Sequence, residues 1–508
     1  MHPTRPARPL AVLLGAAGID ARLEATTAGL EITAIDSDSR SVAPGSLFVA
    51  IPGLRFDGNR FIDAAVARGA AAIVAQRPPD TPIDPSMPVI IVGDSRLALS
   101  DLAAAFYDHP SRALCVAGIT GTDGKTTTAT LLWYAWRAAG LAAASITTID
   151  RRTRDGVTAN PSRQTTPEAP ELQAELARIR DAGCTHVALE TSSHALEMRR
   201  ADGVDFRAAV FTRITTEHLE LHGTRNRYLA AKARLLELVS RRPDGVAVLD
   251  AGDPFGFPRL AAIPVATRLT YTDLPDIAAD LRAEDIVVEP SAVRFIARTP
   301  WGDAGVRLRL AGSFNVRNAL AALAAACATG AGLGSAVGGL EAAEAVTGRM
   351  ERIDLGQPFE VVVDYAHTTD ALETVLHELR RTTAGRLWAV FGSAGERDLE
   401  KRPAMGSVAA RLADVSVITD EDPRGEDRQL ILEQIAAGAV AAGGVRGSTL
   451  FVIPDREEAI GFAVAKAVPG DTVLFAGKGH EKTIDTATGE IPWDERAVAI
   501  AAIRRRIS

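Results

Sequence analysis

Residues 118–128 constrain this chain more than any other segment, because they form a glycine-rich turn with a lysine and a hydroxyl directly after the apolar run 113–117. They read Gly-Ile-Thr-Gly-Thr-Asp-Gly-Lys-Thr-Thr-Thr. A buried strand that leads through such a turn into a helix binds nucleotide phosphates, with Lys125 as a positive charge and Thr126 as a Mg²⁺ ligand. The spacing departs from the strict Walker pattern at Ile119. We expect ATP or GTP to contact Gly121, Thr122, Asp123, Gly124, Lys125, Thr126 and Thr127.

Composition excludes several other classes of protein. The 508 residues are 47% hydrophobic and 24% charged, which is typical of globular domains. A net charge of −8 argues against nucleic acid or an anionic membrane as the main partner. The three cysteines share no metal or redox spacing, and no apolar run reaches about 18 residues. We therefore expect a cytoplasmic protein with neither an export signal nor a membrane span.

The order of apolar and helical segments predicts an α/β protein of three domains, at 1–109, 110–346 and 347–508. The expected strands are 46–51, 71–75, 89–92, 113–117, 186–189, 208–211, 246–249, 359–363, 387–391, 415–418, 450–453 and 472–475. Alternating segments near 286–293 and 305–310, joined by 300–303, favour a hairpin beside the central sheet, and 316–329 favours a helix.

Chemically active residues follow several strands of the third region. Asp364 comes directly after one strand, and the segments that start at Gly392, Thr419 and Gly477 follow three others. Ligands of open α/β sheets bind beyond the carboxyl ends of the strands. The sequence therefore predicts a binding edge there.

The second region offers candidate metal ligands. Glu190 ends an expected strand near the phosphate loop, where a carboxylate can hold Mg²⁺ or simply face solvent. His218 and His222 are four residues apart, a spacing that zinc accepts, but no third ligand stands out and a nucleotide site favours Mg²⁺. Lys232 lies in an apolar helical run, where a lysine normally extends to the helix surface.

Seven motifs in one order make the whole chain resemble the Mur ligases of peptidoglycan synthesis. They are the phosphate loop and residues 189–196, 217–223, 228–232, 312–315, 363–367 and 477–481. The resemblance is strongest to the branch that adds the third residue to UDP-N-acetylmuramoyl-L-alanyl-D-glutamate. Gly-Lys-Gly-His-Glu at 477–481 and Ser-Ser-His-Ala-Leu at 192–196 separate the chain from fourth-residue ligases and folylpolyglutamate synthetases.

The resemblance implies a UDP-binding N-terminal α/β domain, a central P-loop ATPase-like domain with a mostly parallel sheet, and a Rossmann-like C-terminal domain that binds an amino acid. It implies ATP-driven amide formation, in which a substrate carboxylate becomes an acyl phosphate and an amine then displaces phosphate. The implied substrates are UDP-N-acetylmuramoyl-dipeptide and a diamino acid, and the implied protein is a monomer.

By the same resemblance, Lys125, Lys232 and His218 are catalytic. Thr126 and Glu190 would serve one Mg²⁺, and Lys232, carbamylated by CO₂, would serve a second beside His218. A carbamate makes sense next to Mg²⁺, whereas an ammonium does not. The nucleotide would also contact Asn315, at the adenine, and Arg349, Asp364 and His367 from the third domain.

The matching positions for the UDP-sugar-peptide are Ser37, Ser39, Leu54, Arg55, Phe56, Gln164, Thr165, Thr166, Ser192 and Arg200. An arginine such as Arg200 suits a carboxylate, which it binds through two parallel hydrogen bonds. The matching positions for the amino acid are Arg397, Glu421, Asp422, Pro423, Arg424, Gly477 and Glu481.

The amino-acid site departs from the family pattern. Diaminopimelate-adding members usually carry Asp-Asn-Pro-Arg, whereas this chain has Glu-Asp-Pro-Arg at 421–424. Arg424 suits the distal carboxylate of meso-diaminopimelate, which we favour. The added charge of Glu421 and Asp422 instead suits a side-chain amine, as in lysine or ornithine. Asp123, where Asn is usual, and Met198, where some members have Gln, are lesser departures.

Two alternatives remain open at this point. One is a Mur-type ligase with a different amine or acceptor, and the other is a nucleotide-binding scaffold that has lost catalysis. The scaffold is disfavoured because the chain keeps Lys125, Thr126, Glu190, His218, Lys232 and Asp364.

Overall fold

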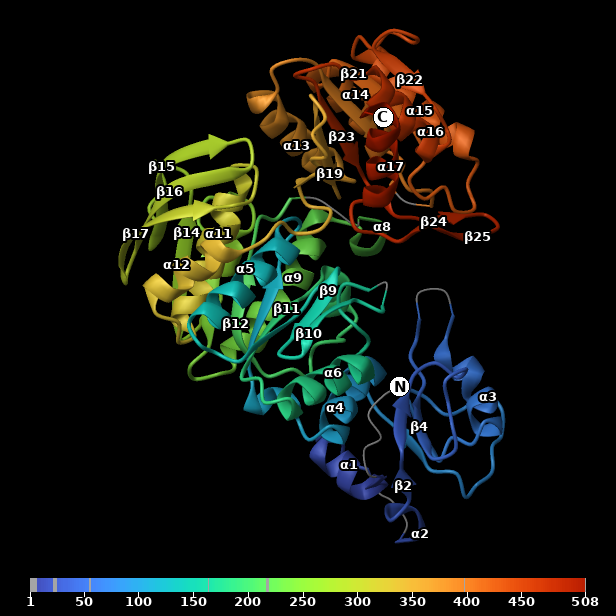
Figure 1. Cartoon of the computed structure of the whole chain (residues 1–508). Coiled ribbons are helices and arrows are strands. Elements are labelled where there is room, and N and C mark those ends of the chain that lie inside the picture. Colours follow the sequence, from blue (N-terminus) through green and yellow to red (C-terminus); the bar gives the residue numbers. More distant parts are fainter. Residues whose placement is uncertain are drawn as a thin grey trace.

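A computed structural model describes residues 7–21, 25–53, 56–162, 164–215, 219–396 and 398–507. Three separate α/β regions follow one another along the chain, and the central one lies between the other two (Figure 1). Across the described residues, no helix is long and apolar enough to cross a membrane.

The N-terminal region is built on a four-stranded parallel sheet of order β3-β4-β5-β6. Its strands are β1 (Arg8–Pro9), β2 (Glu31–Ile32), β3 (Ala34–Asp36), β4 (Ser46–Val49), β5 (Ala72–Ala75) and β6 (Val89–Ile91). Its helices are α1 (Leu10–Ala16), α2 (Ala25–Ala28), η1 (Gly58–Phe61), α3 (Ile62–Ala67) and α4 (Ser95–Phe106). The apolar core beneath α4 also includes Ala169, Ala174 and Ala177 of the next region, so these two regions share a packed interface.

The central region holds a mixed sheet of order β10-β9-β8-β11-β7-β12-β13-β14-β15-β16-β17, parallel from β8 to β15. Its strands are β7 (Cys115–Thr120), β8 (Ala143–Ile146), β9 (Asp150–Thr153), β10 (Gly156–Ala159), β11 (His186–Glu190), β12 (Phe206–Phe211), β13 (Val246–Asp250), β14 (Thr267–Thr272), β15 (Leu281–Glu289), β16 (Ala292–Thr299) and β17 (Gly302–Leu308).

Helices cover both faces of this central sheet, as the buried apolar strands require. They are η2 (Pro110–Ala113), α5 (Lys125–Ala138), α6 (Ala169–Asp181), α7 (Ser193–Glu197), α8 (Leu219–His222), α9 (Arg225–Ser240), α10 (Phe257–Ala261), α11 (Phe314–Ala328) and α12 (Leu333–Ala342). One core cluster lies under α5, α11 and α12, and a second lies under α6 and α9.

Two expectations for this region were wrong in detail. The strand expected at 113–117 is β7. It starts later, at Cys115, because residues 110–113 form the short helix η2, and it runs on through Gly118 to Thr120. The segment expected near 286–293 is the end of β15, a turn and the start of β16. The expected turn at 300–303 does join β16 to β17.

The C-terminal region is a six-stranded sheet of order β18-β19-β23-β20-β21-β22, parallel from β19 to β22. Its strands are β18 (Glu351–Arg352), β19 (Glu360–Asp364), β20 (Leu387–Phe391), β21 (Val415–Ile418), β22 (Leu450–Val452) and β23 (Thr472–Ala476), with the small hairpin β24 (Thr483–Thr486) and β25 (Gly489–Pro492). Its helices are α13 (Thr369–Thr382), α14 (Lys401–Leu412), α15 (Arg428–Ala441), α16 (Arg456–Lys466) and α17 (Glu495–Ile507).

A direct contact joins the C-terminal region to the central one. The carboxylate of Glu378 on α13 accepts hydrogen bonds from the backbone N–H and the hydroxyl of Ser313, at 2.8 and 2.6 Å. Ser313 precedes α11, so this contact fixes the C-terminal sheet beside the segment that carries Asn315.

Candidate active site

The phosphate loop links β7 to α5, with Gly124 at a left-handed φ of 83° just before the helix. A Cβ at Gly124 would lie 2.3 Å from Oδ1 of Asn318, so only glycine fits there. The Lys125 ammonium curls back over the loop and donates to the carbonyl oxygens of Gly121 and Thr122, at 3.2 and 2.7 Å. The loop thus places a cation and the first N–H groups of α5 at one point, which suits a phosphate chain.

The structure brings Thr126 and Glu190 together. The Thr126 hydroxyl is 3.1 and 3.0 Å from the two carboxylate oxygens of Glu190, and the Thr148 N–H donates to the same carboxylate at 2.8 Å. Both side chains are buried, so the solvent-facing alternative for Glu190 is wrong. A hydroxyl and a carboxylate are the oxygen donors that Mg²⁺ prefers.

Lys232 is not a surface lysine. It is 1% exposed, its ammonium donates to the Gly121 carbonyl at 2.6 Å, and it lies 4.5 Å from the centre of the Tyr228 ring. The Tyr228 hydroxyl is 3.1 Å from the hydroxyl of Thr122. Helix α9 therefore delivers Lys232 to the phosphate loop, 111 residues back along the chain.

Of the two histidines with zinc-compatible spacing, only His222 lies among the described residues. His222 is buried, and its Nε2 lies 3.2 Å from the hydroxyl of Ser193. Within the described ranges, no three His, Cys, Asp or Glu side chains gather as a metal would require. The predicted residue His218 lies outside the described residues.

Asp364, a predicted nucleotide contact, lies in the third region. The Asp364 carboxylate, at the end of β19, accepts from the N–H groups of Met350 and Ala366, at 2.7 and 2.8 Å. Burial raises the pKa of Asp364, the positive charge of Arg349 opposes that rise, and the negative charge of Asp123 adds to it. Asp123 belongs to the phosphate loop, so the charge of that loop acts on Asp364.

The other three predicted nucleotide contacts are also placed. The Asn315 amide donates to the carbonyl of Ala311 at 2.7 Å and accepts from Asn318 at 2.9 Å. Arg349 lies over the Tyr365 ring at 4.6 Å. His367 Nδ1 is 2.9 Å from the backbone oxygen of Tyr365.

The residues predicted for the peptide end converge on the carboxyl end of β11. Thr166 donates to the Glu190 carbonyl at 2.9 Å and accepts from the Ser192 N–H at 3.0 Å, while the hydroxyl of Thr165 is 3.1 Å from that of Thr148. The Ser192 hydroxyl caps α7. These contacts form one polar surface beside the predicted metal ligands.

Glu168 belongs to this surface and was missed from the sequence. Its carboxylate pairs with Arg200 at 2.8 Å and accepts from the Gln164 amide at 3.2 Å. Arg200 therefore already binds one carboxylate. Glu168 ends a Thr-Thr-Pro-Glu segment whose sequence is compatible with many kinds of turn, so nothing in it marked Glu168 as a partner.

The predicted sugar contacts are less concentrated. Ser37 and Ser39 lie in the loop after β3. Phe56 is 61% exposed and packs edge-to-face on Phe61, with ring centres 6.4 Å apart. The predicted residues Leu54, Arg55 and Arg397 lie outside the described residues.

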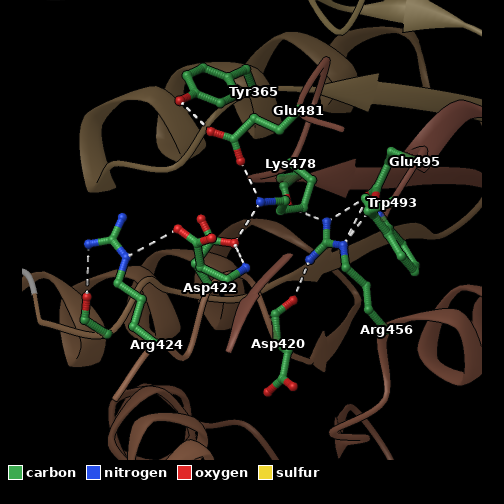
Figure 2. A network of polar contacts seen from close by, with 12 residues as sticks. Tyr365, Asp420, Asp422, Arg424, Arg456, Lys478, Glu481, Trp493 and Glu495 are labelled. Atoms are coloured by element: carbon green, nitrogen blue, oxygen red, sulfur yellow. Dashed lines mark hydrogen bonds and ion pairs between the residues drawn. The ribbon is translucent and has the colours of Figure 1, made fainter. Parts of the chain in front are cut away.

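Figure 2 shows the predicted amino-acid end of the site, where the loops after β21 and β23 meet. The buried Lys478 ammonium donates to Asp422 at 2.8 Å and also contacts Glu481, whose carboxylate accepts from the Tyr365 hydroxyl at 3.0 Å. Burial lowers the pKa of Lys478, but the charges of Glu481 and Asp422 outweigh this effect, so the pKa lies above its usual value and the group stays an ammonium. Asp422 is therefore paired inside the protein, with an ammonium that it shares with Glu481.

Two other side chains of this end have distinct environments. Glu421 is 6% exposed, and one of its carboxylate oxygens has no hydrogen-bond partner among the described residues. It packs on Gly477, where a Cβ would lie 3.3 Å from that oxygen. Arg424, one residue after Pro423, has a left-handed φ of 53° and donates to the Gly395 carbonyl at 3.3 Å.

Three family models match the chain in the order of its three regions. The Mur ligase family catalytic domain matches residues 31–107, the Mur ligase middle domain matches 119–326, and the Mur ligase glutamate ligase domain matches 348–479. The chain belongs to the Mur ligase family. It is therefore an ATP-dependent ligase.

Relatives of this Mur ligase match it along nearly its whole length. A UDP-N-acetylmuramyl-tripeptide synthetase from Roseiflexus sp. is 48% identical, with 93% of this chain and 94% of the relative covered. A UDP-N-acetylmuramoyl-L-alanyl-D-glutamate–2,6-diaminopimelate ligase from Geobacillus kaustophilus is 42% identical, with 94% and 96% covered. A solved structure of a ligase with the second name has a TM-score of 0.67 and 29% identity, with both chains covered completely.

These matches confirm the Mur ligase resemblance and the three-part α/β fold. The exact domain limits at 109 and 346, and the contacts of individual site residues with substrates, stay predictions.

Proposed function

We propose that this Mur ligase joins a diamino acid, meso-diaminopimelate, to UDP-N-acetylmuramoyl-L-alanyl-D-glutamate at the expense of ATP. The observation that carries the proposal is that the predicted site residues gather at the carboxyl ends of parallel strands. Thr126 and Thr166 both contact Glu190 at the end of β11, and the Lys478 network lies beyond the carboxyl ends of β21 and β23. Whole-length relatives that carry names for this reaction support it.

The residues present fit the chemistry. Lys125 would neutralise charge on the phosphoryl group as it leaves ATP, because an ammonium fixed at the loop needs no reorganisation. Thr126 and Glu190 would hold Mg²⁺, which when bound withdraws charge from the phosphates. A carbamate on Lys232 would convert the buried ammonium beside Gly121 into an anionic ligand for a second Mg²⁺, with His218 alongside.

The peptide end would present its carboxylate to the phosphate loop. Thr166 ties the Glu190 strand end to Ser192, so the peptide surface and the metal ligands are held as one unit. Arg200 would bind a substrate carboxylate in competition with Glu168. Enclosure between the central and C-terminal sheets would keep an acyl phosphate from water.

The choice of meso-diaminopimelate rests on Arg424 and on the pairing of Asp422. Besides Nη1, which reaches Gly395, and Nε, which lies 3.9 Å from the Asp485 carboxylate, Arg424 keeps guanidinium N–H groups that suit a second carboxylate. Because Asp422 is paired with Lys478, its carboxylate is engaged within the protein and less available to a ligand's amine. Lysine or ornithine would be favoured if Glu421 and Asp422 were both free to bind a side-chain amine, but neither amino acid has a second carboxylate for Arg424.

The test is phosphate release from ATP by the purified protein, with UDP-N-acetylmuramoyl-L-alanyl-D-glutamate and each of meso-diaminopimelate, L-lysine and L-ornithine in turn. The proposal expects turnover with diaminopimelate. Turnover with lysine or ornithine alone would keep the ligase and reject the amine. ATP binding without turnover on any of the three would point to another acceptor or to a scaffold. The proposal also takes the enzyme to be cytoplasmic and a monomer. Light scattering of the active protein would check that it is a monomer.

A further inference from the structure

Arg456, the first residue of α16, joins the two loops of the amino-acid end although it lies outside both. Its Nη1 donates to the carbonyl oxygen of Asp420 at 2.8 Å, and its Nη2 donates to that of Ala476 at 2.7 Å. Those carbonyls belong to the residues immediately before Glu421 and Gly477. One guanidinium therefore holds the backbone directly before each of the two packed residues (Figure 2).

The guanidinium itself is fixed from the other side. Glu495, the first residue of α17, accepts from Arg456 Nε at 2.9 Å and from Nη2 at 2.5 Å. The indole N–H of Trp493 donates to the same carboxylate at 2.7 Å. Arg456 and Glu495 are 2% and 1% exposed, so the pair is a buried, fully oriented unit.

The charge of Arg456 also acts on the amino-acid end. Burial lowers the pKa of its guanidinium, but the carboxylates of Glu495, Glu421 and Asp422 together raise it above its usual value. The cation thus stabilises both acidic residues of the loop without being exposed to a ligand.

A guanidinium is suited to this task because its N–H donors are planar and diverge at fixed angles. With Nη1 on one loop and Nη2 on the other, the spacing of the two carbonyls follows the spacing of the two nitrogens. A lysine in the same place has one nitrogen at the end of a flexible chain and cannot hold both carbonyls and Glu495 in the same geometry.

We propose that Arg456, oriented by Glu495 and Trp493, is a positioning residue that sets the separation of the Glu421 and Gly477 loops and thereby the affinity for the diamino acid. This inference rests on the proposed function, since it assigns the site between these loops to the diamino acid. Arg456 touches no substrate, and its effect passes through the two backbone carbonyls.

The experiment measures KM separately for ATP, the UDP-sugar-dipeptide and the diamino acid in the wild type and in Arg456→Lys. We expect KM for the diamino acid to rise about tenfold, with the other two KM values unchanged within about twofold. Trp493→Phe, which removes only one N–H from Glu495, should give a smaller rise of about threefold for the diamino acid alone.

Trp388→Phe is the matched control, because the Trp388 indole also donates to a buried carboxylate, that of Asp471, at 3.0 Å. Asp471 directly precedes β23, at the end of the strand opposite to Gly477. This variant should leave all three KM values unchanged. If the substitutions act only by lowering stability, Trp388→Phe and Trp493→Phe should change the three KM values alike.

Equal KM values for the diamino acid in wild type and folded Arg456→Lys would overturn the proposal, as would a parallel rise of all three. If the circular dichroism spectrum shows that Arg456→Lys does not fold, Trp493→Phe decides. An unchanged KM for the diamino acid in that variant overturns the proposal. Failure of the wild type to use any diamino acid would instead reject the proposed function, and the two failures are therefore distinct.

Discussion

The ammonium of Lys232 lies 2.6 Å from the carbonyl oxygen of Gly121, so a buried lysine of α9 touches the turn that we predict to receive the phosphates of ATP. Lys232 is 1% exposed, so its side chain is removed from solvent and held against the phosphate loop. The contact explains how a residue 111 positions away in sequence can serve the phosphate loop.

Replacement of Lys232 by alanine should lower kcat by about 10²-fold or more, because the site loses a charged group next to the transferring phosphoryl group. Steady-state phosphate release checks this. If a carbamate is the active form, a short carboxylic acid such as acetate should restore part of the activity by occupying the vacated space.

The matched control is Lys466→Ala, which changes an exposed lysine at the end of α16 and should have no effect. An inactive Lys232→Ala that no carboxylic acid rescues would argue against the carbamate. Wild-type activity that is independent of added bicarbonate at low CO₂ would argue the same way.

Glu190→Gln should raise the Mg²⁺ concentration needed for half-maximal activity about tenfold or more, since an amide binds Mg²⁺ far more weakly than a carboxylate. The hydrogen bonds from Thr126 and Thr148 can persist to the remaining oxygen, so the fold should be kept. Glu197→Gln, on the exposed face of α7, is the control. A Mg²⁺ titration of phosphate release measures both, and identical curves for wild type and Glu190→Gln would remove Glu190 from the metal site.

The binding edge of the C-terminal sheet could be predicted because its strands are buried and parallel. The limits of β20 and β21 match the expected 387–391 and 415–418, since both are fully apolar or small and flanked by turn residues. Once strands are parallel, their carboxyl ends share one edge, so the joint placement of Asp364, Glu421 and Gly477 follows from the pattern alone.

Short polar strands could not be predicted in the same way. All four residues of β10 and of β25 are exposed, so neither shows the apolar alternation that marks a strand. The partners of buried charges were equally out of reach. Nothing in the sequence joins Glu168 to Arg200 or Arg456 to Glu495, because these pairs form only when separate loops are packed together.

Asp250, at the end of β13, should make stability fall as the pH rises. Burial raises its pKa from 3.8 to about 6, with Arg317 opposing that rise and Asp273 and Asp253 adding to it. Between these two values the folded state holds a proton that the unfolded state has lost, so the free energy of unfolding decreases with pH. Above about pH 6 the loss is complete.

Asp250→Asn removes this ionisation. Relative to wild type, the variant should gain about 2 kcal/mol of stability between pH 4 and pH 7, measured by urea unfolding at both values. Asp276→Asn, at an exposed position nearby in the chain, should show no such gain. A constant difference between Asp250→Asn and wild type at the two pH values would contradict the prediction.

Arg424 should discriminate between diamino acids by the second carboxylate. Its backbone N–H donates to the carbonyl oxygen of Asp485 at 2.9 Å. Its side chain is 25% exposed, with Nη1 on Gly395 and Nε 3.9 Å from the Asp485 carboxylate, so other N–H groups remain available to a ligand. Arg424→Lys replaces a two-pronged donor by a single ammonium. We expect KM for meso-diaminopimelate to rise about tenfold to a hundredfold, with little change for L-lysine where it is a substrate.

Arg428→Lys is the control, because Arg428 pairs with the Asp420 carboxylate at 2.6 Å on the same loop and is 45% exposed. Equal changes in KM for the two amino acids would show that Arg424 reads the part they share, the α-amino-acid group, and would leave the specificity for the distal carboxylate to another residue.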